Sequence, residues 1–168
     1  MIDVGNQPSE AAAGPAPHGF RGISVPVRDL AQARQFYTAV LGGDLAFEQP
    51  DYAEVTFGSF VVGLGKQDKG ATPREAEYPH YAFTVGPEEF VAAKQRLEEC
   101  GIPTHEPWGR TGRSAALMYF RDPSGNQFEI YSEDGAPIPL RIGARAGGDY
   151  VVPFATLSYD ELPTAARG

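Results

Sequence analysis

Two residues with metal-binding side chains, His80 and Glu129, lie in separate predicted strands of the second half of the sequence. His80 begins the run HYAFTV, and Glu129 lies within QFEIYS, directly after the turn sequence DPSG. An imidazole and a carboxylate brought together from adjacent strands could bind a divalent cation. They could also act without a metal, with His80 as a general base whose pKa the nearby carboxylate raises. Taken singly, each could equally be structural, as a water-facing carboxylate or a hydrogen-bonded histidine at a strand start.

The elements that would position these residues occur twice along the chain. In the first half, hydrophobic alternation predicts strands at 22–27, 44–48, 53–57 and 60–64, and helical spacing predicts a helix that Asp29 caps and Gly42 ends. In the second half, strands are predicted at 80–85, 115–120 and 127–132, with a weaker one at 104–107 and a helix from Pro87 to Gly101. Each half therefore has the order strand, helix, three strands.

The spacing of equivalent residues supports a duplication. Val27 and Val85 end the opening strands, and they are 58 residues apart, as are the glycines at 43 and 101 that end the helices. The hairpin glycines at 58 and 125 are 67 residues apart, so the second half carries about nine extra residues. With these offsets, His80 corresponds to Gly22 and Glu129 to Val62. Neither Gly22 nor Val62 has a side chain that could bind a metal.

The predicted fold class is α+β, with two tandem βαβββ modules that form a cupped mixed sheet around a cavity. Residues 1–18 are expected to be a disordered tail, and residues 19–132 a single domain with modules at about 20–65 and 80–132. Residues 133–168 contain apolar pieces such as YVVPFATL, so we expect a C-terminal extension that packs on the body or on a partner subunit.

Composition excludes several kinds of partner. The 14 basic residues are outnumbered by 22 acidic ones and form no cluster, which argues against nucleic acid and anionic membranes. No apolar run is long enough for a membrane helix, and no secretory signal is visible, so a soluble, cytoplasmic protein is expected. Cys100, the single cysteine, is expected to pack at a helix end.

The segments ISVPVRDL, ARQFYTAVLGG, HYAFTV and YFRDPSGNQFEIY together resemble the vicinal oxygen chelate superfamily. This superfamily includes glyoxalase I, extradiol dioxygenases, fosfomycin-resistance enzymes and bleomycin-binding proteins. The resemblance covers roughly residues 20–132 and includes the DPxGNxxE signature. It implies that paired modules bring ligands around one metal and leave positions open for two neighbouring oxygens of a substrate.

The resemblance also implies roles for particular residues. Glu129 is similar to the terminal carboxylate ligand of the family, and His80 to the histidine that opens the second module. Gly22 stands where metal-binding members usually have His or Gln, so the third ligand is not identified. His18 could supply it only if the tail folded back or crossed to a partner, and His105 is expected at the cavity rim or in solvent.

Further pocket residues follow from the same resemblance. Tyr119 is placed like a pocket-lining tyrosine of fosfomycin-type members and is a candidate catalytic residue, although it could be an ordinary core aromatic. Trp108 and Arg110 lie in a PWGR segment like that of bleomycin-resistance proteins. The substrate pocket is therefore predicted to contain the following residues: Gly22, Ser24, Val62, Trp108, Arg110 and Tyr131.

The sequence leaves three functions open: the metal-free enzyme described above, in which His80 acts as a general base, and two others, of which we favour the first. One is an enzyme that uses a divalent metal (Fe, Mn, Zn or Ni) as a Lewis acid, either a ring-cleaving dioxygenase or a lyase or isomerase. The other is a metal-free protein that binds or sequesters a small molecule, such as an antibiotic, in a cavity widened by Gly22 and Val62. In both cases the partner is a small molecule, and the chain is expected to form a homodimer.

Overall fold

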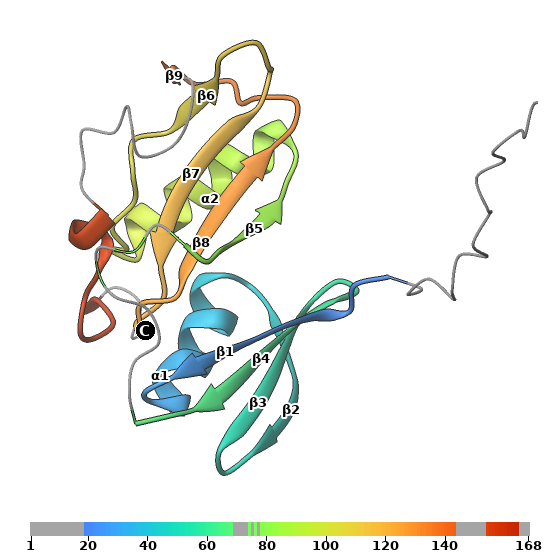
Figure 1. Cartoon of the computed structure of the whole chain (residues 1–168), viewed down its shortest axis with the longest axis vertical. Helices are drawn as coiled ribbons and strands as arrows, with labels where there is room; N and C mark the ends of the chain where they lie inside the picture. The colour runs from blue at the N-terminus through green and yellow to red at the C-terminus, as the bar shows by residue number, and fades with distance from the viewer. Residues whose placement is uncertain (1–18, 69–73, 75, 77, 144–153, 165–168) are drawn as a thin grey trace, which may run out of the picture.

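The computed structural model describes residues 19–68, 74, 76, 78–143 and 154–164, which form two βαβββ modules (Figure 1). The predicted N-terminal tail, 1–18, and with it His18, lies outside the described residues. Each module has one sheet, ordered β1-β4-β3-β2 in the first and β5-β8-β7-β6-β9 in the second. The α+β class and the duplicated module are therefore confirmed, and among the described residues no strand pairing joins the two sheets.

The bounds of the first module are β1 (Gly22–Val27), α1 (Leu30–Gln35), the π-helical turn η1 (Phe36–Val40), β2 (Asp44–Gln49), β3 (Tyr52–Phe57) and β4 (Phe60–Lys66). Those of the second are β5 (His80–Thr84), α2 (Pro87–Glu99), β6 (Trp108–Arg110), β7 (Ala116–Arg121) and β8 (Gln127–Ser132). The extension adds β9 (Arg141–Gly143), parallel to β6, and the 3-10 helix η2 (Phe154–Leu157).

Local signals in the sequence account for the helix ends. Asp29 has an extended backbone, and its carboxylate accepts a hydrogen bond from the amide of Gln32 at 2.9 Å, which caps α1. Pro87 opens α2 at a position where a missing N–H costs nothing, and Gly101 ends it with a φ of +69°. These residues therefore account for the starts of α1 and α2 and for the end of α2.

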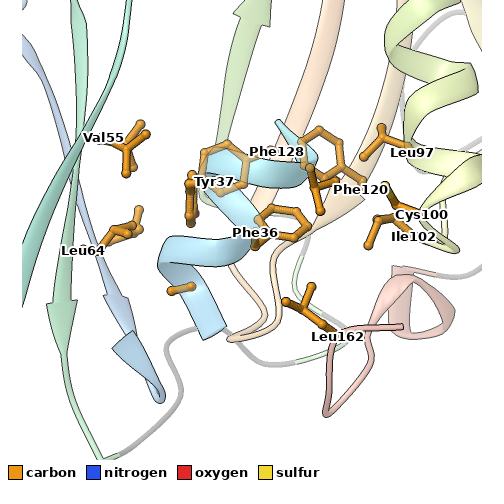
Figure 2. Packing of buried hydrophobic residues seen from close by; sticks show 14 of the residues in the cluster. Phe36, Tyr37, Val55, Leu64, Leu97, Cys100, Ile102, Phe120, Phe128 and Leu162 are labelled. Atoms are coloured by element: carbon orange, nitrogen blue, oxygen red, sulfur yellow. The ribbon is translucent and has the colours of Figure 1, made fainter. Parts of the chain in front are cut away.

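The hydrophobic core lies between the modules and includes one face of each sheet. Phe36 and Tyr37 of η1 point toward Phe120 and Phe128 of the second sheet, and Tyr37 meets Phe128 edge to face with ring centroids 5.7 Å apart (Figure 2). Cys100 is buried beside them at the end of α2, as predicted for a packing residue. Because one face of each sheet is used in this way, the opposite faces are directed away from the core.

The turn between β7 and β8 forms hydrogen bonds that link the two modules. Asp122 is fully buried, and its carboxylate accepts hydrogen bonds from the Tyr37 hydroxyl at 2.9 Å and from the side-chain amide of Asn126 at 2.7 Å. Asn126 also donates to the carbonyl oxygen of Pro26 at 2.9 Å, and the Ser124 hydroxyl accepts from the amide of Arg28 at 3.0 Å. The DPSGN sequence is therefore structural, and it places Glu129 in fixed register with β5.

Part of the C-terminal extension packs against the body. Leu157 and Leu162 are buried, and the Tyr159 hydroxyl donates to the carbonyl oxygen of Arg121 at 2.9 Å. Residues 144–153 and 165–168 lie outside the described residues. Within the described ranges, no helix is both long enough and apolar enough to cross a membrane.

Candidate functional site

His80 and Glu129 come together on the open face of the second sheet, the face directed away from the core. Their strands β5 and β8 are parallel neighbours, with His80 beside Gln127 and Ala82 beside Glu129. The Nε2 atom of His80 lies 3.4 Å from Oε2 of Glu129. The two side chains are 22% and 6% exposed, so the pair is largely shielded and can still be reached from solvent.

An open cavity of about 630 Å³ surrounds this pair. All of its lining residues come from the second module, on β5 to β8 and the segment just before β5. They are Tyr78, His80, Ala82, Trp108, Arg110, Leu117, Tyr119, Glu129 and Tyr131. The structure thus brings His80 and Glu129 together with the predicted pocket residues of the second module, which local sequence alone could not establish.

Tyr119 lies directly opposite Glu129 in the antiparallel pairing of β7 and β8. Burial raises the pKa of the Tyr119 phenol well above its ordinary value, and the charge of Glu129 and a hydrogen bond to it raise the pKa further. The phenol therefore stays protonated at neutral pH and acts as a hydrogen-bond donor. Its ring also meets the His80 ring edge to face, with centroids 5.2 Å apart.

A row of aromatic rings continues from this pair to the C-terminal extension. Beyond Tyr119, the ring of His105 lies 5.8 Å away, and the ring of Phe154 packs on His105 at 4.7 Å. His105 is only 1% exposed, so the expectation that it lies at the rim or in solvent is wrong. The extension covers His105, and Phe154 also contacts the ring of the lining residue Tyr119, with centroids 5.8 Å apart, which the sequence did not reveal.

The other side of the cavity is apolar. Trp108 and Leu117 are paired across β6 and β7 and are buried together with Ala115, while Tyr131 packs against them. Arg110 is exposed at the end of β6. This arrangement places apolar side chains next to a pair of metal-binding side chains, as expected for a site that orients part of a small organic molecule.

Gly22, Ser24 and Val62 lie in the first sheet, on β1 and β4. Gly22 pairs with Val61 in the same way that His80 pairs with Gln127, which confirms that Gly22 is the equivalent of His80. With this register, however, the equivalent of Glu129 is Gly63. Val62 is fully buried in the core, so its predicted place in the pocket is wrong.

The first sheet has its own open face, and it carries a polar cluster absent from the predicted site. Tyr52 donates a hydrogen bond to Glu54 at 3.2 Å, and Glu54 forms an ion pair with Arg21 at 3.2 Å. A hydrogen bond from Arg21 lowers the pKa of Glu54, which is therefore a carboxylate at neutral pH. The alternation of β3 could have revealed this cluster, because Tyr52 and Glu54 share a face.

The donor types at His80 and Glu129 fit a divalent metal. A neutral imidazole and a carboxylate suit Mn, Fe, Zn and related ions, and the two side chains lie 3.4 Å apart on paired strands. Among the described residues, no group of three or more His, Cys, Asp or Glu side chains is arranged to hold a metal. The described part of one chain thus presents two protein ligands, whereas catalytic metal sites commonly have three.

Comparison with known proteins agrees with the duplicated fold. The family model described as "Glyoxalase/Bleomycin resistance protein/Dioxygenase superfamily" matches residues 19–130. The chain is 32% identical over 111 residues to a glutathione transferase FosA of Serratia marcescens, covering 65% of this chain and 77% of the relative. It is 30% identical over 112 residues to a metallothiol transferase FosB of Staphylococcus epidermidis, covering 66% and 78%.

Solved structures show the same fold at lower identity. The glyoxalase/bleomycin resistance protein/dioxygenase of Alicyclobacillus acidocaldarius superposes with a TM-score of 0.61 at 25% identity, covering 70% of this chain and 93% of that one. The fosfomycin resistance protein FosX of Listeria monocytogenes, complexed with Mn(II) and sulfate, superposes with a TM-score of 0.62 at 18% identity, covering 70% and 91%.

Proposed function

The chain belongs to the Glyoxalase/Bleomycin resistance protein/Dioxygenase superfamily, and from that premise we propose that it is an enzyme that uses a divalent metal. Its substrate is a small organic molecule with two neighbouring oxygens, and the reaction is of the lyase, isomerase or transferase type. The observation that carries this proposal is the His80–Glu129 pair, 3.4 Å apart in an open cavity.

The metal, when bound, supplies a Lewis acid that polarises substrate oxygens and stabilises developing negative charge. His80 and Glu129 are its protein ligands from this module. Tyr119 holds and orients the Glu129 carboxylate by donating its single hydroxyl proton to it. Trp108 and Leu117 exclude water from one side and orient the apolar part of the substrate.

The names of the sequence relatives support this choice of reaction. Relatives named glutathione transferase and metallothiol transferase favour addition or group transfer over ring cleavage by oxygen. The Mn(II) in the solved FosX complex makes Mn(II) the first ion to test here. His plus carboxylate is compatible with Fe, Zn and Ni as well.

A second copy of the chain completes the site in this proposal. Two described protein ligands are fewer than a catalytic metal commonly has, and the open faces of the two sheets are both directed away from the core of their own chain. The first sheet also exposes Leu45 and Phe47 on β2, and Phe20 precedes β1 with 77% of its surface exposed. A homodimer that pairs the first sheet of one chain with the second sheet of the other would cover these surfaces.

A metal-free binding protein is the second candidate, and one specific observation favours it. A Cβ atom at Gly22 would lie 2.0 Å from the backbone oxygen of Val61, so the usual ligand position of the family is closed to any side chain in this backbone. The aromatic wall could then hold a planar ligand without a metal.

One binding experiment separates the two candidates. Trp108 is the only tryptophan and lies in the cavity, so its fluorescence reports on occupancy. Acetohydroxamate, which chelates metals through two neighbouring oxygens, should change this fluorescence only after Mn(II) is added, and His80→Ala should abolish the change. Glu48→Ala is the matched control, because Glu48 pairs with Arg34 away from the cavity. Equal binding with and without metal would contradict the enzyme proposal.

A further inference from the structure

The open face of the first sheet is built around a glycine that leaves room for polar side chains. A Cβ atom at Gly63 would lie 2.4 Å from the Tyr52 hydroxyl oxygen and 2.6 Å from the Ser24 hydroxyl oxygen. Glu54 is the direct neighbour of Gly63 in the β3–β4 pairing and accepts the hydrogen bond of Tyr52. Gly63 thus has no side chain that could bind a metal, and the space beside it is occupied by the oxygen-bearing side chains of Ser24, Tyr52 and Glu54.

The register of the two modules shows what this cluster replaces. Glu54 pairs with Gly63 as Tyr119 pairs with Glu129, so Glu54 is the equivalent of Tyr119. The first module therefore has glycine at both equivalents of the metal-binding pair and a carboxylate where the second module has a phenol. On this face the Glu54 carboxylate is displaced by a single strand from the usual ligand position at Gly63, a distance of about 4.8 Å.

We propose that Glu54 of a second copy of the chain is the third protein ligand of the metal that His80 and Glu129 hold. This inference rests on the proposed function, namely on a metal site that two copies share. When two similar modules pair about a pseudo-twofold axis, residues of the two open faces that lie near this axis approach one another. Glu54 is then directed toward the His80–Glu129 pair, and the length of a Glu side chain compensates for the displacement by one strand.

The surroundings of Glu54 leave it able to change partners. Its ion pair is with Arg21, whose side chain is 72% exposed, and exposed ion pairs of this kind contribute little to stability. The side chain of Glu54 itself is 21% exposed, and it lies on a sheet face that the core of its own chain does not cover. One imidazole and two carboxylates favour an ion that prefers oxygen ligands, such as Mn(II), over one that prefers sulfur.

The first arm of the test measures Mn(II) affinity by the electron paramagnetic resonance signal of the free ion. With metal-stripped full-length protein, Glu54→Ala should weaken Mn(II) binding by at least about tenfold, since even the loss of residues behind the ligands costs that much. Glu48→Ala, which removes the same charge from β2 of the same sheet, should bind Mn(II) like the parent. Parent-like affinity in Glu54→Ala, with affinity lost in His80→Ala, would overturn the inference and leave the proposed function intact.

The second arm tests whether Glu54 acts across chains. Chains with Glu54→Ala and chains with Glu129→Ala are produced together, each with a different affinity tag, and the mixed dimers are isolated. Each mixed dimer has one site with all three ligands and one site with neither carboxylate, so about half of its sites should bind Mn(II) with parent affinity. Mixed dimers in which no site binds Mn(II) with parent affinity would overturn the inference. A parent protein that binds no Mn(II) would overturn the proposed function, and the inference with it.

Discussion

Replacing Gly22 with alanine tests whether the backbone of the first module excludes any side chain at the position equivalent to His80. In the structure the added Cβ would lie 2.0 Å from the oxygen and 2.8 Å from the carbonyl carbon of Val61, whereas real Cβ atoms essentially never come within 3.0 Å of a neighbour. Strand β1 must therefore move by about 1 Å relative to β4. Both atoms belong to the backbone of a paired strand, so rotation of a side chain cannot relieve the contact.

The cost follows from this displacement. Overpacking in a well-ordered site costs about 1–3 kcal/mol, and the hydrogen bond from the amide of Val61 to the carbonyl oxygen of Arg21 lies at the same place and adds about 1 kcal/mol if lost. We expect Gly22→Ala to lower the free energy of unfolding by about 2–4 kcal/mol in total. Gly22→His should be at least as unfavourable, so one substitution cannot restore the usual ligand.

Urea unfolding followed by far-ultraviolet circular dichroism, at one fixed protein concentration, measures the effect. Gly65→Ala on β4 is the matched control, because its Cβ would meet only the oxygen of Val25 at 3.9 Å. The control should be neutral or more stable by about 0.4–1 kcal/mol, since alanine restricts the unfolded chain. If Gly22→Ala were as stable as Gly65→Ala, the reasoning from the close approach of β1 to β4 would be refuted.

Three further predictions concern the contacts that support the site. Tyr37→Phe removes one donor from the buried Asp122 carboxylate, so it should cost about 1.5–3 kcal/mol in urea unfolding. Burial raises the pKa of Asp122 above its ordinary value of 3.8. The folded state therefore keeps a proton that the unfolded chain loses just above pH 3.8, and the free energy of unfolding should fall as pH rises through that window; Asp122→Asn should lose this slope. Phe154→Ala removes ring contacts with His105 and Tyr119 and should cost about 1–3 kcal/mol, with a smaller loss in Phe154→Leu.

Each of these predictions has an outcome that contradicts it. Tyr37→Phe with parent stability would mean that the hydroxyl does not stabilise the carboxylate. A parent and an Asp122→Asn variant with the same dependence on pH would contradict the raised pKa. Equal unfolding free energies for Phe154→Ala and the parent would show that the extension does not support the cavity wall.

Most of the second module could be predicted from the sequence because its signals are local. Alternation in HYAFTV and QFEIYS indicates strands, and the DPSGN turn fixes where β8 begins, so the sequence places His80 and Glu129 on two strands of the same module. The parallel pairing of β5 with β8 is a finding of the structure, because the order of strands along the chain does not determine which of them are neighbours. The short distance between the two side chains is a consequence of this register.

The assignment of Val62 failed for a physical reason. It assumed that Gly58 and Gly125 are equivalent turn residues, but the first hairpin has a two-residue turn between Phe57 and Phe60, whereas five residues separate Arg121 from Gln127 in the second. The glycines therefore occupy different positions in loops of different length. A shift of one residue moves a side chain to the other face of a strand, from the open face at Gly63 to the core at Val62.

The position of His105 could not be predicted because the contacts that bury it are distant in sequence. Its ring is covered by Phe154, which belongs to the extension outside the matched family region. No local pattern around His105 indicates that a segment far along the chain returns to this sheet. In contrast, Glu54 has a local signal, because it alternates with core residues of β3. The duplication alone does not point to Glu54, because it is equivalent neither to His80 nor to Glu129.

The most direct test of a metal-dependent site is the metal content of the full-length protein, purified without a chelator or a metal-binding tag and measured by elemental analysis. A site held by His80 and Glu129 predicts near-stoichiometric divalent metal in the parent and in Glu48→Ala, with loss of metal in both His80→Ala and Glu129→Ala. Absence of metal in the parent, even after anaerobic addition of Mn(II), Fe(II), Zn(II) and Ni(II), would contradict a metal-dependent site and leave a metal-free binding protein.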